Sequence, residues 1–270
     1  MSTFRLTREV RFAVNDLSDE QLSNPPSNSY AGFPSLTGFG QYFRVQVTLE
    51  GKLNPQSCYL RNIKEIDRAV REQIVPAVDT NVALLRKGQS EFARLDIESL
   101  FVFLHNRFEP DQLHSLTLFL SPFLSLTQLA SEQHMATRLS QKFEFSASHR
   151  LHNPKLNDEE NRKTFGKCNN PNGHGHNYEL QVTLKGKPST SGLLVDVPAF
   201  ERVVKEYVID KLDHKNLNLD VPEFKEFIPT VENIAMVIFR MLKSRFTGIG
   251  AELASVTVWE TPKTWCEYSE

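Results

Sequence analysis

Alternating apolar and polar residues predict two strands in the second half of the chain. In residues 177–186, every second side chain from Tyr178 to Leu184 is apolar, with polar or charged residues between them. This is the two-residue period of a strand that buries one face. Residues 142–148 show the same alternation. We therefore expect two strands here, each with one face in the core.

A longer apolar period predicts two helices after these strands. Residues 198–208 gather their apolar side chains on one helical face. Thr230 is expected to cap a second helix, whose apolar stripe ends at Leu242. A closing strand is expected at residues 254–259. Strands, two amphipathic helices and another strand form an α+β pattern, in which the helices cover one face of an antiparallel sheet.

The first half of the chain repeats this order of elements. Residues 46–51 (QVTLEG) correspond to residues 181–186 (QVTLKG), 135 positions later. We therefore predict two tandem units, residues 1–140 and residues 141–270. The first unit is expected to hold strands near residues 7–14, 42–49 and 115–119, a Ser/Asn/Pro-rich loop over residues 18–29, and helices near residues 63–75 and 92–108.

Composition and charge limit the classes of function. The chain is 40% hydrophobic and 24% charged, as in an ordinary globular protein. Its net charge of −2 does not suggest nucleic-acid binding driven by phosphate neutralisation. We find no signal peptide and no apolar window of membrane-spanning length, so we expect a cytoplasmic protein without a membrane partner. Three cysteines without framework spacing do not predict a disulfide scaffold.

Chemistry is expected first in residues 168–178 (CNNPNGHGHNY). His174 and His176 share the parity of the apolar face of the following strand, and His149 ends the preceding strand at matching parity. If the two strands pair, three imidazoles meet. Three histidines with a fourth position left open form a ligand set of catalytic zinc, which acts as a Lewis acid or lowers the pKa of a bound oxygen. The alternative is that these histidines are core residues or belong to a solvated loop.

Other side chains extend this candidate site. Cys168 lies in a polar loop near the expected cation, where thiolate is favoured, although a lone cysteine can also be a small buried hydrophobe. Asp213 can orient the His214 imidazole so that it takes a proton from a thiol, but the two can also be a surface pair. Glu260 follows a strand and can either bind paired N–H donors of a heterocycle or be a solvated acid at the strand end. Glu232 lies near the N-terminus of a predicted helix, where the helix dipole alone favours an acidic residue without any role in the site.

The first unit lacks most of these groups, although Asp79 still matches Asp213. Aligning the two units places Phe39 opposite His174, Gln41 opposite His176, Phe33 opposite Cys168, Thr80 opposite His214 and Leu120 opposite Glu260. We therefore predict that residues 1–140 form a degenerate structural partner without metal ligands.

Taken together, these segments resemble the 6-pyruvoyltetrahydropterin synthase family, over most of residues 142–270. The Cys-x5-His-Gly-His block is the most specific part. The other matching segments are FSASHRL (145–151), LDHKNL (212–217), TVEN (230–233) and WET (259–261).

The resemblance implies a tunnelling fold (T-fold) whose sheets assemble into a β-barrel of a homo-oligomer. It also implies a zinc-dependent lyase of tetrahydrobiopterin-type pterin biosynthesis. The expected substrate is 7,8-dihydroneopterin triphosphate, which loses triphosphate and gives 6-pyruvoyltetrahydropterin. The implied roles are Zn²⁺ binding by His149, His174 and His176, proton transfer by Cys168 with a relay through Asp213 and His214, and pterin anchoring by Glu260 with Thr230 and Glu232 nearby.

Two alternatives remain. A related enzyme, 6-carboxytetrahydropterin synthase of queuosine and other deazapurine biosynthesis, uses the same substrate but cleaves a carbon–carbon bond. Its common bacterial form has a shorter gap between the cysteine and His-Gly-His, so the five residues here favour the pyruvoyl activity. The other alternative is a non-catalytic pterin-binding or metal-storing protein, which the retained Cys168 argues against, because storage needs no base.

Overall fold

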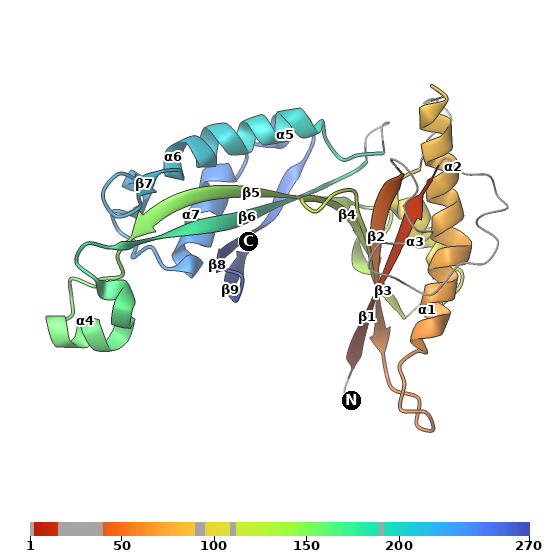
Figure 1. The fold of residues 1–270 in the computed structure, drawn as a ribbon, viewed down its shortest axis with the longest axis horizontal. Helices are drawn as coiled ribbons and strands as arrows, with labels where there is room; N and C mark the ends of the chain where they lie inside the picture. The colour runs from red at the N-terminus through yellow and green to blue at the C-terminus, as the bar shows by residue number, and fades with distance from the viewer. Residues whose placement is uncertain (1–2, 16–39, 90–94, 109–111, 189–191) are drawn as a thin grey trace. The chain divides into compact units, whose positions relative to one another are not determined.

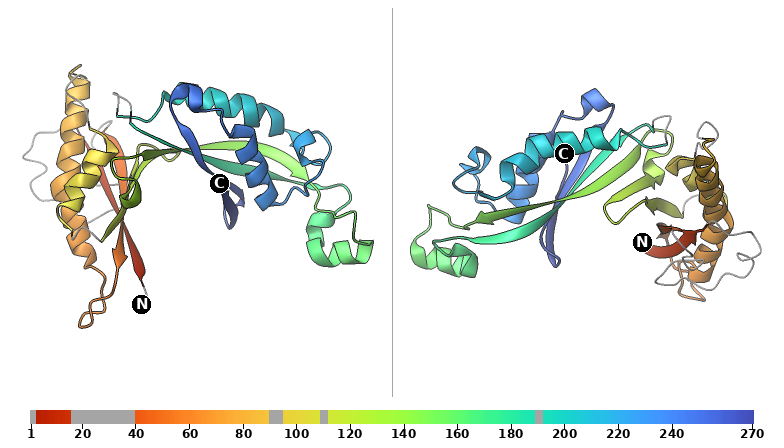
Figure 2. Two further views of the ribbon diagram at one scale, coloured as in Figure 1. Left: turned by 180° about the vertical axis from the view of Figure 1, so that it is seen from behind. Right: turned by 45° about the horizontal axis from the view of Figure 1, so that its top comes forward.

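The computed structural model describes residues 3–15, 40–89, 95–108, 112–188 and 192–270. The chain forms two compact units, Met1–Leu139 with Gly186–Leu194, and Ser140–Lys185 with Val195–Glu270. In each unit, helices cover one face of an antiparallel sheet (Figures 1 and 2), which confirms the predicted α+β class. No helix within the described ranges is both long and apolar enough to cross a membrane.

The first unit has strands in the order β1-β2-β3-β4, each antiparallel to the next. Buried stacking between Phe12 and Phe43, with ring centroids 5.5 Å apart, joins the first two strands in the core. The strands are β1 (Phe4–Val14), β2 (Gln41–Gly51), β3 (Leu113–Phe119) and β4 (Leu124–Leu129). The helices are α1 (Ile63–Ala69), a π-helical turn (Val70–Ile74), α2 (Val75–Arg86), α3 (Ile97–His105) and a 3₁₀ turn (Ala130–Glu132).

The second unit has strands in the order β5-β6-β8-β9, and the short strand β7 pairs in parallel with β5. The strands are β5 (Thr137–His149), β6 (His174–Gly186), β7 (Lys215–Asn216), β8 (Glu252–Thr261) and β9 (Thr264–Tyr268). The helices are α4 (Asp158–Phe165), α5 (Val197–Val204), a π-helical turn (Lys205–Ile209), α6 (Asp210–Leu212) and α7 (Val231–Leu242). Three 3₁₀ turns complete it, at Gly166–Asn169, Pro222–Phe224 and Thr247–Ile249.

The two units share irregular features at matching positions. Each helical layer contains a π-helical turn, over Val70–Ile74 and over Lys205–Ile209. The β2–β3 ladder shifts register after Thr48, and the β6–β8 ladder shifts after Thr183. Because π-turns are rare and bulges occupy defined positions, these agreements allow the two units to be compared residue by residue.

Several elements differ from the sequence-based expectation. The helix expected over residues 63–75 continues through the π-helical turn to Arg86, and the helix expected over residues 92–108 spans Ile97–His105. Residues 92–94, the loop at residues 18–29, Phe33 and Phe39 lie outside the described residues. The strands β4 and β9 and the helix α4 are not predicted by the apolar pattern. The helix α4 is polar, and a capping box between Asn157 and Glu160 begins it.

Candidate active site

Three histidines meet where two neighbouring strands of the second unit come together. His149 is the last residue of β5, while His174 and His176 are the first and third residues of β6. Their ligand nitrogens all lie within 4.8 Å of one another, and the Nε2 atoms of His149 and His174 are 3.1 Å apart. His149 is completely buried, and the other two are half-buried. The predicted meeting of three imidazoles is thus present.

A glycine allows this close approach. Gly173, just before β6, has a φ of +72°, which favours glycine. A Cβ atom built there would lie 2.9 Å from the carbonyl oxygen of His149. A larger residue would therefore push the start of β6 away from the end of β5 and separate the imidazoles.

The surroundings of His149 determine which nitrogen it can offer to a ligand. Its Nδ1 atom lies 2.7 Å from the carbonyl oxygen of Pro229, which can only accept a hydrogen bond. Nδ1 therefore carries the hydrogen, and the Nε2 lone pair faces the other histidines. Burial lowers the pKa of His149 to about 4, so the ring is neutral near pH 7.

The hydroxyl group of Tyr178 lies on the far side of the same ring. It is 3.4 Å from Nδ1 of His149, and the tyrosine ring stacks on Phe145 with centroids 4.9 Å apart. Burial raises the pKa of Tyr178, so its hydroxyl stays protonated. Tyr178 shares the parity of His174 and His176, so its place on this face follows from the sequence. No sequence pattern indicates that the Pro229 carbonyl contacts His149.

Glu260 brings a carboxylate to the histidine cluster. It lies near the end of β8, where its Oε1 atom is 3.3 Å from Nε2 of His149 and 3.5 Å from Nε2 of His176. Its side chain is 19% exposed. The Nε2 atom of His176 is buried and has no hydrogen-bond partner among the described residues. The strand end therefore supplies a shielded negative charge beside the imidazoles.

The donor set fits a metal ion. Neutral imidazole nitrogens are common ligands of divalent transition metals, and three of them with one open position suit a catalytic site. His149 has its second nitrogen engaged with a carbonyl oxygen, as metal-bound histidines usually have. The three-histidine group can therefore hold a metal ion.

Cys168 and the Asp213–His214 pair are not joined. Cys168 lies in the 3₁₀ turn before β6, and its carbonyl oxygen accepts a hydrogen bond from Leu151 just after β5. The Oδ2 atom of Asp213 lies 2.8 Å from Nδ1 of His214. The Oδ1 atom of Asp213 accepts a hydrogen bond from the amide of Ser146. Within the described part of the chain, no hydrogen bond or ion pair links Cys168 to either residue. The His214 side chain is 82% exposed.

The remaining predicted residues belong to α7. Thr230 is its N-cap and accepts a hydrogen bond from the amide of Asn233. Its neighbour Pro229 contacts His149, so Thr230 lies beside the cluster. Glu232 is exposed in the first turn, and burial of Cys266, followed by the charge of Glu232, raises the pKa of that thiol. Glu232 is therefore near β9, and none of its contacts within the described residues reaches a histidine of the cluster.

Comparison with known proteins identifies the relatives of this chain. The family described as 6-pyruvoyl tetrahydropterin synthase matches residues 138–270. The human protein named 6-pyruvoyl tetrahydrobiopterin synthase is 45% identical over 126 residues, which are 46% of this chain and 85% of the human protein. The chain belongs to the 6-pyruvoyl tetrahydropterin synthase family. A second member, from Dictyostelium discoideum, is 41% identical over 48% of this chain and 93% of its own length.

A relative with a different name is more distant. A Haemophilus influenzae protein named 6-carboxy-5,6,7,8-tetrahydropterin synthase is 29% identical over 49% of this chain and 99% of its own length. Membership of the 6-pyruvoyl tetrahydropterin synthase family confirms the T-fold prediction for the matched residues. The family match begins at residue 138, so nearly all of the first unit lies outside it.

Proposed function

We propose that this chain is a zinc-dependent 6-pyruvoyltetrahydropterin synthase, a lyase that converts 7,8-dihydroneopterin triphosphate to 6-pyruvoyltetrahydropterin with elimination of triphosphate. The observation that carries the proposal is the cluster of His149, His174 and His176 beside the Glu260 carboxylate. The cluster lies in the part of the chain that matches the synthase family. Three free thiols support the cytoplasmic location that belongs to this proposal.

The three histidines are the proposed zinc ligands. Their nitrogens converge, and the Pro229 carbonyl keeps the hydrogen of His149 on Nδ1, so that Nε2 is available. These histidines would hold Zn²⁺, which when bound would supply Lewis-acid polarisation of the side-chain oxygens of the pterin and so raise the acidity of the neighbouring C–H bonds. The role of the protein groups is to hold the ligand nitrogens in place, to exclude water and to move protons.

Glu260 is the proposed pterin anchor. A carboxylate at a strand end can accept hydrogen bonds from two adjacent N–H groups of the pterin ring. Its low exposure supports this role, because a charge-assisted hydrogen bond is stronger when water is excluded. Thr230, next to the Pro229 contact, is proposed to line the same site, with Glu232 in the first turn of α7.

Cys168 is the proposed proton-transferring base, whose Sγ atom accepts a proton from a side-chain carbon of the pterin. Asp213 and His214 are the proposed relay. Because the His214 side chain is 82% exposed and makes no described contact with Cys168, we propose that a second copy of this chain completes the relay in a homo-oligomer. The Asp213–His214 hydrogen bond already holds the imidazole in one orientation.

The first unit, residues 1–140, is proposed to be a degenerate copy of the catalytic unit, residues 141–270. The shared π-helical turn and the shared bulge support this relation, since neither is dictated by the apolar pattern alone. We propose that the first unit forms part of the walls of the interfaces between subunits in the oligomer. Full activity of isolated residues 142–270 at the same subunit stoichiometry would contradict this role.

The product of turnover tests the proposed activity. The zinc-loaded protein is incubated with 7,8-dihydroneopterin triphosphate, and the pterin is identified by mass spectrometry. We expect the pyruvoyl product, because the matched part of the chain is 45% identical to the human protein named as the pyruvoyl enzyme and 29% identical to the bacterial protein named as the carboxy enzyme. A carboxy product with acetaldehyde would replace the proposed activity by the deazapurine-pathway reaction. Tight pterin binding without turnover would indicate a binding protein.

A further inference from the structure

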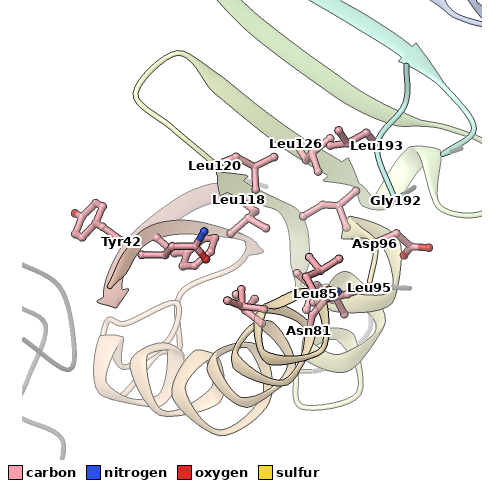
Figure 3. A pocket seen from close by; sticks show the side chains of 16 residues that line it. Tyr42, Asn81, Leu85, Leu95, Asp96, Leu118, Leu120, Leu126, Gly192 and Leu193 are labelled. Atoms are coloured by element: carbon pink, nitrogen blue, oxygen red, sulfur yellow. The ribbon is translucent and has the colours of Figure 1, made fainter. Parts of the chain in front are cut away.

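The first unit contains an apolar pocket between its helices and its sheet. The pocket has a volume of about 500 Å³. Figure 3 shows Leu118, Leu120 and Leu126 of the β3–β4 side across from Asn81 and Leu85 of α2. Leu193, in a segment that belongs to the same compact unit, closes one side. This volume is within the usual range for a small-molecule site.

The strands place this pocket where the second unit has its histidine cluster. Val45 pairs with Leu118 between β2 and β3, and Leu180 pairs with Val258 between β6 and β8. Val45 and Leu180 are 135 positions apart, which is the spacing that also separates the two bulges. Four residues before these positions, Gln41 takes the place of His176. Gln41 is the first residue of β2, and His176 is the third residue of β6.

The other two sides of the site correspond as well. Two residues after the paired position on the next strand, Leu120 of the first unit takes the place of Glu260. Asp96 caps α3, and Thr230 caps α7. Gln41, Leu120, Asp96 and the first residues of α3 all line the pocket. The pocket is therefore the counterpart of the candidate active site, with different side chains at the corresponding positions.

These side chains change the chemistry of the site. Among the described residues that line it, there is no histidine, cysteine, lysine or arginine, so it offers neither a transition-metal ligand set nor a cation for an anionic ligand. One oxygen of the Asp96 carboxylate accepts a hydrogen bond from the amide of Ser99, 2.7 Å away. In Figure 3 Asp96 and Tyr42 lie at opposite margins of the leucine cluster.

We propose that this pocket binds a neutral, largely apolar small molecule without a metal ion. Leucine, valine and isoleucine side chains supply most of the lining, and the amides of Gln41 and Asn81 supply hydrogen-bonding groups. A pterin held as proposed for the second unit is disfavoured, because its adjacent N–H donors would face Leu120 in place of the Glu260 carboxylate and would lose their hydrogen bonds with water. The Asp96 carboxylate does not take that position, and one of its oxygens already caps α3. This inference does not depend on the proposed activity of the second unit.

The test uses the full-length, metal-loaded protein and 1-aminoanthracene, an uncharged aromatic probe whose fluorescence rises in apolar surroundings. Leu120→Glu places a carboxylate in the pocket, and Asn81→Trp fills part of it from α2. Each change should weaken probe binding by at least roughly tenfold, because a buried unpaired charge and a lost volume both oppose occupancy. Leu53→Glu is the matched control, since Leu53 is 38% exposed and lies outside the pocket.

Probe binding by the unmodified protein and by the three variants decides whether the pocket is a ligand site. Binding of about one probe per chain, weakened by both pocket variants and unchanged by the control, supports the proposal. If Leu120→Glu fails to fold, as judged by its melting curve, the Asn81→Trp titration decides. Absence of probe binding to the unmodified protein, or equal binding by all variants, overturns it. Displacement of the probe by neutral pterin at equal affinity would overturn the assigned ligand class.

Discussion

Replacing Glu260 by glutamine separates two roles that the site geometry allows. The carboxylate lies 3.3 Å from Nε2 of His149 and 3.5 Å from Nε2 of His176, so it is close enough to ligate a metal as well as to anchor a pterin. As an anchor, it accepts two hydrogen bonds that are each worth about 1.5–3 kcal/mol because the acceptor is charged. Loss of both, as in Glu260→Ala, corresponds to about 3 kcal/mol or more, and therefore to at least about a hundredfold weaker substrate binding or lower kcat/KM. Glutamine loses one of them, which corresponds to about 1.5–3 kcal/mol and at least about tenfold.

The amide of glutamine keeps the volume of the side chain but presents an NH₂ group to one of the pterin donors. We therefore expect Glu260→Gln to retain its full metal content after dialysis and to lose substrate affinity. Metal per chain is measured by mass spectrometry of the protein digest, and pterin affinity is measured by fluorescence titration. Glu260→Ala should behave in the same way. A fall in metal content, with unchanged pterin affinity in the molecules that keep the metal, would refute the anchor role and make Glu260 a ligand.

Three further changes test other parts of the chain. Cys168→Ala should retain metal and pterin binding but lower kcat by about 10²–10⁴-fold, the usual loss of an acid–base group, and unchanged turnover would exclude the base role. Phe200→Ala removes a completely buried ring and should lower the free energy of unfolding in urea by about 3–5 kcal/mol, whereas Phe4→Ala, at a side chain that is 45% exposed, should change it by less than about 0.5 kcal/mol. The amide of Ser146 and then His214 lower the pKa of Asp213 below its ordinary value of 3.8, so its stabilising effect is present above that value and is lost as the pH falls further. Urea unfolding below pH 4 should therefore show a shallower pH dependence for Asp213→Asn than for the unmodified protein, and equal slopes would contradict this reasoning.

The parity of the side chains made much of the site predictable. A strand alternates its side chains between two faces, so His174 and His176 had to lie on the face that Tyr178 buries. The same reasoning placed His149 at the end of β5. Thr230 was identifiable as an N-cap because a hydroxyl before an apolar helical stripe satisfies a free backbone amide.

Other features depend on contacts that no local pattern records. The Pro229 carbonyl that holds His149 belongs to a loop 80 residues away in the sequence. The close contact of Glu260 with the cluster depends on how β8 registers against β6. Strand β9 is only five residues long, and its pairing with β8 cannot be read from alternation over so short a span. Such features require the tertiary arrangement, because each is set by a partner that is distant in the chain.

In our two proposals, one arrangement of strand ends and helix N-terminus supports a polar site in the second unit and an apolar site in the first. The ladder register and the bulge fix the backbone, and neither requires the residues at the strand ends to be polar. Gln41 and Leu120 therefore stand in the first unit where His176 and Glu260 stand in the second, and the pocket that they line is mostly apolar. It follows that substitutions at these strand-end positions should alter the class of ligand bound far more than the free energy of unfolding. At core positions such as Phe200, by contrast, substitutions should alter stability far more than ligand class, because the buried side chain is closely packed.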